Sequence, residues 1–339
     1  MSEDPRGIVP IDWPGLVREA IRRRKAERMT QRDHAALAGV SVPTIVAFDR
    51  AGTTLSLAKA FDILRVVGLL EAKDRAGSQR AFVGDAFERW RQLTATLPGG
   101  SHARFPHGWC RIDYELAGPL KPVTVSGLRE ALKQSVAPHA GWPLFLFLTQ
   151  PGLAPYEQDE AIQCWVKPQD GGGGVRAFGD AAHCDFWRVS TQGRAMTIRG
   201  HQEDGEETFA PGTILDATLP IWRLAEALLH AARLARHVSE DPPATQVRLR
   251  ALYTGLGGRV LKSWANPLSD LFIEGGASRS DEAQLEITAA ALDIEAELPR
   301  LVHSMVASLY ERFGVSGLSL ERVKAETTRM LNSRTRGRR

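Results

Sequence analysis

The sequence has few cysteines and no long hydrophobic run, and each absence excludes a class of protein. Its 339 residues include three cysteines, an odd number. Cys110, Cys164 and Cys184 have neither the spacing of a zinc site nor that of a disulfide framework. The longest apolar run, Leu144 to Leu148, is far shorter than the roughly 18 residues of a membrane-spanning helix. We therefore expect a reduced, cytoplasmic protein without a membrane segment.

The start of the chain and its motif content exclude further classes. The first residues, Met-Ser-Glu-Asp-Pro, are acidic and polar, so we expect no signal peptide. The chain contains no G-x-S-x-G, no H-E-x-x-H and no Walker-type phosphate loop. We expect neither an enzyme nor a bound metal or cofactor.

Two polar segments could be mistaken for ligand sites. His183 to Asp185, together with Cys164 and His201, suggests a metal site, but adjacent residues of a strand point to opposite faces and cannot easily share one ion. Ordinary histidines and buried cysteines explain this pattern better. Gly255 to Arg259 resembles a phosphate loop only superficially, since the pattern around it predicts strands and no helix. We expect a turn there.

The hydrophobic pattern divides the chain into three parts. Residues 1–72 show closely spaced short helices, residues 73–104 a linker and a connecting helix, and residues 105–339 a mixture of strands and helices. The boundary before the third part is placed at the Pro98–Ser101 break. Because the strands come mostly before the helices, we expect the larger part to be α+β.

Several elements of the larger part can be predicted from periodicity and turn residues. Strands are expected at Trp109–Leu116, Pro143–Thr149, Ala161–Val166, 285–288, as a hairpin within Phe186–Arg199, and as two strands within Val247–Trp264. Helices are expected at Val125–Val136, Leu219–Val238, Leu298–Phe313 and Leu318–Leu331. A basic tail, Arg334 to Arg339, ends the chain.

The hydrophobic pattern of the first part, residues 1–72, predicts four helices with recognisable ends. The first carries apolar residues at helical spacing, the second follows Thr30 as N-cap, and the third follows Ser41, with Pro43 in its first turn. Gly39 lies at the expected turn between the second and third helices. The apolar face of the fourth helix is expected to hold Leu57, Ala60, Phe61, Leu64 and Val67.

This pattern resembles the Cro/repressor-type (XRE) helix-turn-helix family. A small residue, Ala35, stands where two helices approach closely, and Val40, Ile45 and Phe48 have the spacing of buried anchors. The residues that carry the resemblance are Thr30-Gln31, Ala35, Ala38 to Ser41, Thr44-Ile45, Asp49 and Ser56-Leu57. They cover residues 14–70, about a fifth of the chain. The expected fold is an all-α N-terminal helix-turn-helix domain followed by a larger α+β domain.

The resemblance implies roles for individual side chains. The side chain of Gln31 would contact a phosphate of double-stranded DNA. Those expected to face the bases are Val42, Pro43, Thr44 and Ala47. Those expected to follow the DNA backbone are Arg50, Thr53 and Thr54. Family members often carry Gln, Arg or Asn where this chain has Val, Pro and Ala. Readout should therefore depend on thymine methyl groups and DNA shape.

The first helix is strongly basic, and its charges allow two interpretations. Arg22, Arg23 and Lys25, with Arg24 and Arg28 beside them, could form a solvated face with pairs such as Glu19 with Arg23. Next to a helix-turn-helix, the same side chains become candidate phosphate contacts. The basic C-terminal tail allows the same two interpretations.

These observations predict a sequence-specific DNA-binding transcriptional regulator. We expect a homodimer, with dimer contacts in residues 105–331 or in the connecting helix around Trp90, and a small-molecule or protein effector acting on the larger domain. The alternative is an antitoxin-like or defence-associated interaction component whose DNA binding serves autoregulation. An enzyme with a DNA-targeting arm is a third alternative.

Overall fold

The computed structural model describes residues 12–38, 40–69, 75–137, 142–168, 183–205, 209–263 and 274–336. The chain divides into two compact units, Met1–Ser78 and Gln79–Arg339, and each is described by itself. Within the described ranges, no helix is long and apolar enough to cross a membrane.

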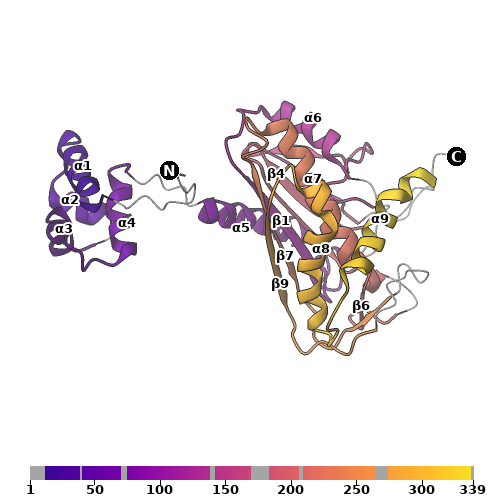
Figure 1. Cartoon of the computed structure of the whole chain (residues 1–339). Coiled ribbons are helices and arrows are strands. Elements are labelled where there is room, and N and C mark those ends of the chain that lie inside the picture. Colours follow the sequence, from indigo (N-terminus) through magenta and orange to yellow (C-terminus); the bar gives the residue numbers. More distant parts are fainter. Residues whose placement is uncertain are drawn as a thin grey trace, which may run out of the picture. The chain divides into compact units, whose positions relative to one another are not determined.

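The smaller unit is helical, and side chains at the helix starts explain where its helices begin. Its helices are α1 (Trp13–Ala26), α2 (Gln31–Leu37), α3 (Val42–Asp49) and α4 (Leu57–Val66) (Figure 1). Thr30 and Asp33 hydrogen-bond each other's backbone N–H, both at 3.1 Å, as in a capping box. Ser41 caps α3 by accepting from the N–H of Thr44. Both predicted N-caps are confirmed, whereas Gly39 lies outside the described residues.

The core of the smaller unit forms where the four helices meet. Ile45 and Phe48 of α3 are fully buried, and Val17 and Ala20 of α1 pack in the same cluster. One prediction for α4 is wrong. Phe61 is 37% exposed, and Ile63 is fully buried in its place. The buried stripe therefore runs through Ala60, Ile63 and Leu64 of α4 and continues to Val67, directly after the helix.

The larger unit is built on an antiparallel sheet. Its helices are α5 (Arg75–Thr94), α6 (Val125–Ser135), α7 (Leu219–Val238), α8 (Ile294–Glu311) and α9 (Leu320–Arg336). Its strands are β1 (Trp109–Ala117), β2 (Tyr156–Gln158), β3 (Ala161–Trp165), β4 (Phe186–Ser190), β5 (Arg194–Gly200), β6 (Ile214–Asp216), β7 (Gln246–Tyr253), β8 (Val260–Lys262) and β9 (Ala283–Ala290). Among the described residues, seven strands form the main sheet in the order β2-β3-β4-β5-β1-β7-β9, while β6 and β8 form a separate parallel pair.

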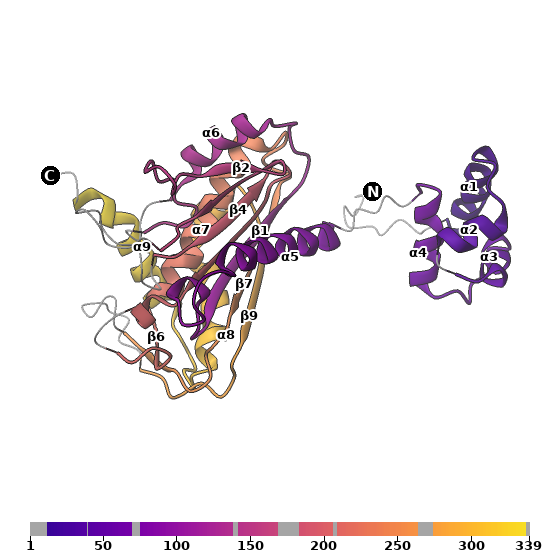
Figure 2. The same cartoon turned by 180° about the vertical axis from the view of Figure 1, so that it is seen from behind.

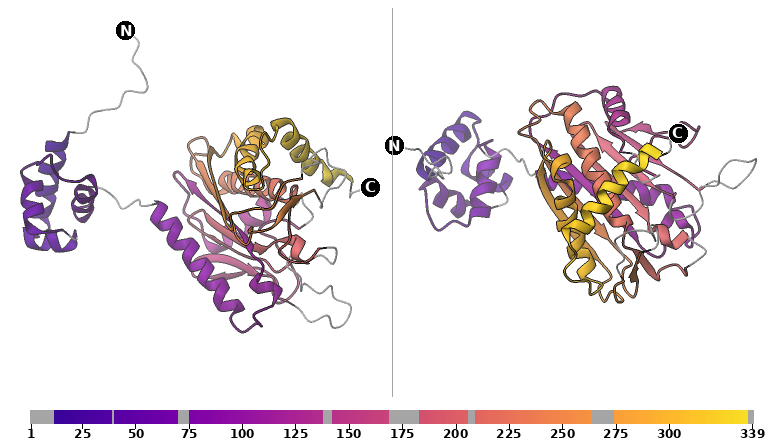
Figure 3. Two further views of the ribbon diagram at one scale, coloured as in Figure 1. Left: turned by 90° about the horizontal axis from the view of Figure 1, so that it is seen from below. Right: turned by 45° about the vertical axis from the view of Figure 1, so that its right-hand side comes forward.

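Both faces of the main sheet are covered, although unequally. Helices α6, α7 and α8 lie on one face with α9 outside them, and α5 crosses the other face (Figures 2 and 3). Side chains along a strand alternate between the two faces. In β5, Ala195 packs toward α7 whereas Met196 and Ile198 pack toward α5. The expected multi-domain chain, with helices first and an α+β domain after them, is confirmed at this level.

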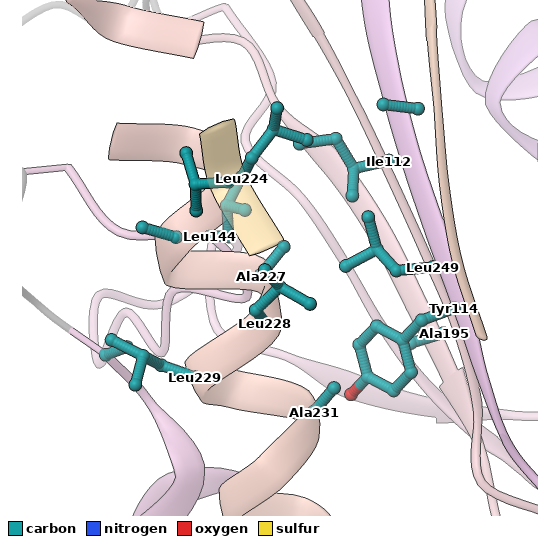
Figure 4. Close-up of a cluster of buried hydrophobic side chains, with 14 of the residues drawn as sticks. Ile112, Tyr114, Leu144, Ala195, Leu224, Ala227, Leu228, Leu229, Ala231 and Leu249 are labelled. Carbon is teal, nitrogen blue, oxygen red and sulfur yellow. The ribbon is translucent and has the colours of Figure 1, made fainter. Parts of the chain in front are cut away.

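Helix α7 is the centre of the larger core. Its leucine and alanine side chains, including Leu224, Leu228 and Ala231, face Tyr114 and Leu249 of the sheet (Figure 4). A polar contact is enclosed among them, because the Tyr114 hydroxyl lies 2.8 Å from Nδ1 of His230. Burial lowers the pKa of His230 to about 3, so this imidazole is neutral at physiological pH.

The apolar run at 143–149 is buried from Pro143 to Phe145 and half-buried from Leu146 to Leu148, but it does not form the predicted strand. Phe145 has a positive φ of 56°, which interrupts an extended conformation. This turn stacks the Phe145 ring on His230, with ring centroids 4.2 Å apart, and Trp187 donates to the carbonyl of Leu146. The run is therefore apolar because it packs beside α7 as a loop.

The connecting helix α5 belongs with the larger unit. Val83, Ala86 and Trp90 pack against the sheet, and the Trp90 ring stacks on Phe105 at 5.5 Å. The division between the units thus falls at Ser78–Gln79, whereas the sequence pattern places the domain boundary at the 98–101 break. Since Trp90 is 6% exposed, its ring is not available for the dimer contact considered above.

The packing of α5 leads to a stability prediction. Trp90→Ala should lower the free energy of unfolding of the larger unit by about 3–5 kcal/mol, because it leaves a large cavity between α5 and the sheet. Denaturant unfolding followed by circular dichroism measures this loss. Leu292→Ala, at a side chain that is 45% exposed, is the control and should cost less than about 0.5 kcal/mol. Equal losses in the two variants would show that α5 is not part of the core.

Candidate nucleic-acid interface

Helix α3 has a buried side and an open side. Ile45 and Phe48 are fully buried, while Val42 is 40% exposed and Pro43 is also exposed. Thr44 and Ala47 are half-buried on the same open side. The four side chains expected to face bases are therefore accessible in the smaller unit by itself.

The N-terminal end of α3 is held in a fixed geometry. The Ser41 hydroxyl lies 2.8 Å from the Thr44 hydroxyl and accepts from the Thr44 N–H at 3.4 Å. Pro43 lies in the first turn, where its fixed φ and missing N–H suit a helix start. The exposed Val42 and the half-buried Thr44 thus stand on a rigid helix end.

The segment after α3 turns sharply and presents polar side chains. Ala51 has a positive φ of 54°, and the N–H of Gly52 donates to the carbonyl of Ala47. Arg50, Thr53 and Thr54, expected to follow the DNA backbone, are all exposed.

Asp49 joins three helices through hydrogen bonds. Arg24 of α1 makes a two-point contact with its carboxylate, at 2.9 and 2.6 Å, and Gln31 of α2 donates to it at 2.6 Å. The side chains of Arg24 and Asp49 are only 7% and 14% exposed. Arg24 is therefore a structural residue, and the sequence interpretation that grouped it with phosphate contacts is wrong. Gln31 remains exposed beside this junction.

The basic side of α1 is partly neutralised by one carboxylate. Arg22 makes two hydrogen bonds to Glu19, and Arg23 makes one to Glu19 and two to the carbonyls of Val67 and Gly68. Hydrogen bonds from Arg22 and then Arg23 lower the pKa of Glu19 to about 2. Lys25 is exposed. The ion pair between Glu19 and Arg23 that the sequence predicts therefore forms, and Arg23 also fixes the end of α4.

Positive charge is concentrated in this part of the sequence. Residues 12–69 contain ten Lys and Arg against six Asp and Glu, a net charge of +4, whereas the whole chain carries +3. Surface charge of this sign attracts the phosphates of DNA without regard to sequence.

His34 of α2 is a structural residue that sequence reasoning did not single out. It is fully buried, and its Nε2 lies 2.9 Å from the carbonyl oxygen of Ile63 in α4. This bond connects the helix that precedes the turn to the fourth helix. A histidine inside an apolar helix pattern was the available signal.

The polar segments of the larger unit make structural contacts. Sγ of Cys164 donates to the carbonyl of Leu153, and His201 Nε2 lies 2.9 Å from the carbonyl oxygen of Thr254. Among the described residues, no three His, Cys, Asp or Glu side chains come together as metal ligands. The segment from Gly255 is a turn between β7 and β8, as expected.

Comparisons of this chain with protein-family models, with curated proteins and with solved structures find no match.

The Asp49 junction leads to a second stability prediction. Asp49→Ala should destabilise the smaller unit by about 3–5 kcal/mol, because it leaves the buried Arg24 guanidinium without its partner. Glu19→Ala removes a half-buried carboxylate that also binds two arginines, and should cost much less, because ion pairs near the surface contribute little to stability. Thermal unfolding of the full chain compares the two variants. If Asp49→Ala is as mild as Glu19→Ala, the junction does not hold the helices together.

Proposed function

We propose that the smaller unit is a helix-turn-helix that binds double-stranded DNA through α3, and that the protein is a transcriptional regulator. The observation that carries the proposal is that α3 has one buried side and one open side. Its anchors Ile45 and Phe48 are buried, while at its capped N-terminal end Val42 and Pro43 are exposed and Thr44 is half-buried. In a helix-turn-helix, this end of the second helix reads base edges in the major groove.

The chemistry of the open side favours contacts with methyl groups and with DNA shape. Val42, Pro43 and Ala47 offer apolar surface, and Thr44 offers a methyl group with a hydroxyl already near Ser41. Apolar side chains recognise the thymine C5-methyl group. The lack of a two-point donor at these positions limits direct readout of guanine and adenine.

Phosphate contacts would come from side chains around this helix. Gln31 would contact a phosphate at the start of α2, Arg50, Thr53 and Thr54 beyond the end of α3, and Lys25 with Arg22 and Arg23 from α1. For Arg22 and Arg23, binding would exchange hydrogen bonds to Glu19 for bonds to phosphate. Such contacts add affinity and salt dependence but carry no sequence information.

The protein would bind an inverted repeat as a homodimer, because a single recognition helix reads few bases and two of them can span successive turns of the groove. The larger unit would supply the dimer contacts and respond to a small-molecule or protein effector.

Changes on the open side of α3 should act on specificity. Thr44→Ala should weaken binding to the cognate site by about 1–3 kcal/mol and binding to random DNA little, because it removes a local contact with the groove. Ala47→Glu should weaken binding further, since it brings a carboxylate into a negative potential. Titrations of both variants with cognate and random duplexes measure these effects. A folded Ala47→Glu variant that binds the cognate site normally would remove the support for this recognition helix.

Changes on the basic side of α1 should act on affinity alone. Arg22→Ala should weaken binding to cognate and random DNA alike and lower the slope of log K against log salt by about one. Arg300→Ala is the matched control, because Arg300 also pairs with a glutamate three residues before it, Glu297, on an exposed helix face. Both variants lose one positive charge. Equal effects would show that net charge, and no contact by Arg22, governs the binding.

A further inference from the structure

A cavity in the larger unit lies between β1, β5 and the first turns of α7. Its volume is about 40 Å³, and its walls include Thr197, Arg199, His201, Glu203 and Arg223. A buried water needs roughly 10–15 Å³ of such space, so the cavity has room for about three water molecules or one small polyatomic ion.

Arg199 lines this cavity with hydrogen-bond donors that are not used elsewhere. The residue is 6% exposed, and its Nη2 pairs with Asp185. Its Nε and Nη1, and the hydroxyl of Thr197, have no hydrogen-bond partner within the described parts of the chain. Buried polar groups in proteins are nearly always satisfied, and a buried guanidinium with unmatched donors is costly.

A second buried arginine shows how the same unit satisfies such a group where the fold alone requires it. Arg259 is fully buried, and its three nitrogens bond to Asp204 and to the carbonyls of Gly255, Ile214 and His107, at 2.7–2.8 Å. In Arg199, by contrast, two nitrogens have no hydrogen-bond partner among the described residues, and this residue lines the cavity.

Arg223 brings a second positive charge to the same cavity. It donates to the carbonyl of Trp142, to Gln202 at 3.4 Å, and lies 3.5 Å from the carboxylate of Glu226. Burial, and next the charge of Arg199, lower the pKa of Arg223 to about 10, so it stays protonated at pH 7. Two guanidinium groups thus repel each other at one cavity wall.

Each arginine has one buried carboxylate beside it, Asp185 for Arg199 and Glu226 for Arg223, and the other titratable groups of the cavity wall change this balance little. Burial, and next the charge of Asp216, raise the pKa of Glu203 to about 7, so this carboxyl is largely neutral in slightly acidic solution. Burial, and next Arg259, lower the pKa of His201 to about 4, so its ring is neutral. The Cys110 thiol also lines the cavity, and burial raises its pKa to about 12.

We propose that this cavity binds a small oxyanion, either a carboxylate or a phosphate group, between Arg199 and Arg223. The free Nε and Nη1 of Arg199 can each donate a charge-assisted hydrogen bond to an anion oxygen, which are the bonds by which arginine binds carboxylate and phosphate. The Thr197 hydroxyl supplies a third donor. The cavity volume excludes a whole nucleotide. This proposal does not depend on DNA binding; if the protein is a regulator, the cavity is the site of its effector.

The test is calorimetric titration of the full chain with inorganic phosphate, sulfate and malonate at matched ionic strength, with chloride as reference. We expect one site per chain. The probe that binds with the highest affinity shows whether the natural ligand carries a phosphate or a carboxylate group. Arg199→Gln should weaken that binding about tenfold to a hundredfold, since it removes charge-assisted hydrogen bonds. Arg188→Gln is the control, because Arg188 is also a buried arginine but bonds to Gln163 and the carbonyl of Gln158 instead.

Thr197→Val keeps the proposal testable if Arg199→Gln fails to fold. Valine has nearly the same shape, and removing an unmatched buried hydroxyl should raise the unfolding temperature without anion. The same change should weaken anion binding severalfold. Binding of no probe by the wild-type chain, or equal affinity in the wild-type and Thr197→Val chains, would overturn the proposal. Neither result depends on whether the smaller unit binds DNA.

Discussion

The ion pair between Arg24 and Asp49 fixes the helix on which the proposed function depends. Asp49 is the last residue of α3, and its carboxylate also accepts from Gln31 of α2. A single side chain therefore sets the position of α3 relative to two other helices. Ile45 and Phe48 then fix the rotation of α3 about its own axis, because both must be buried. Together these constraints determine which side of α3 is open.

The larger unit follows from a sheet that must be covered on both faces. Helix α7 is buried on nearly all sides, since it lies between the sheet and the outer helices. On the opposite face, α5 covers Met196 and Ile198 with an aromatic surface. Between the two covered faces, Arg199 at the end of β5 and Arg223 at the start of α7 are enclosed and line a cavity.

Much of the fold could be predicted from the sequence, because local signals agree with it. The caps Thr30 and Ser41, the hairpin turn near Gly193 and the long apolar pattern of α7 each determine an element boundary within a few residues. At 143–149 the pattern predicts a strand and the chain forms a loop, because buried loops and buried strands are both apolar. Likewise, the apolar pattern of α4 does not show which of its residues meet the other helices, and Ile63 is buried where Phe61 is expected.

The candidate sites were less predictable, since their geometry arises from long-range contacts. Arg24 and Arg22 look alike in the sequence, yet one is buried against Asp49 and the other is exposed with Glu19. Selection of binding sites from random duplex DNA tests the central claim most directly. The full chain should enrich an inverted repeat with half-sites about 34 Å apart, and a chain lacking residues 12–69 should enrich none. Enrichment of no motif, or of the same motif by both chains, would contradict the account.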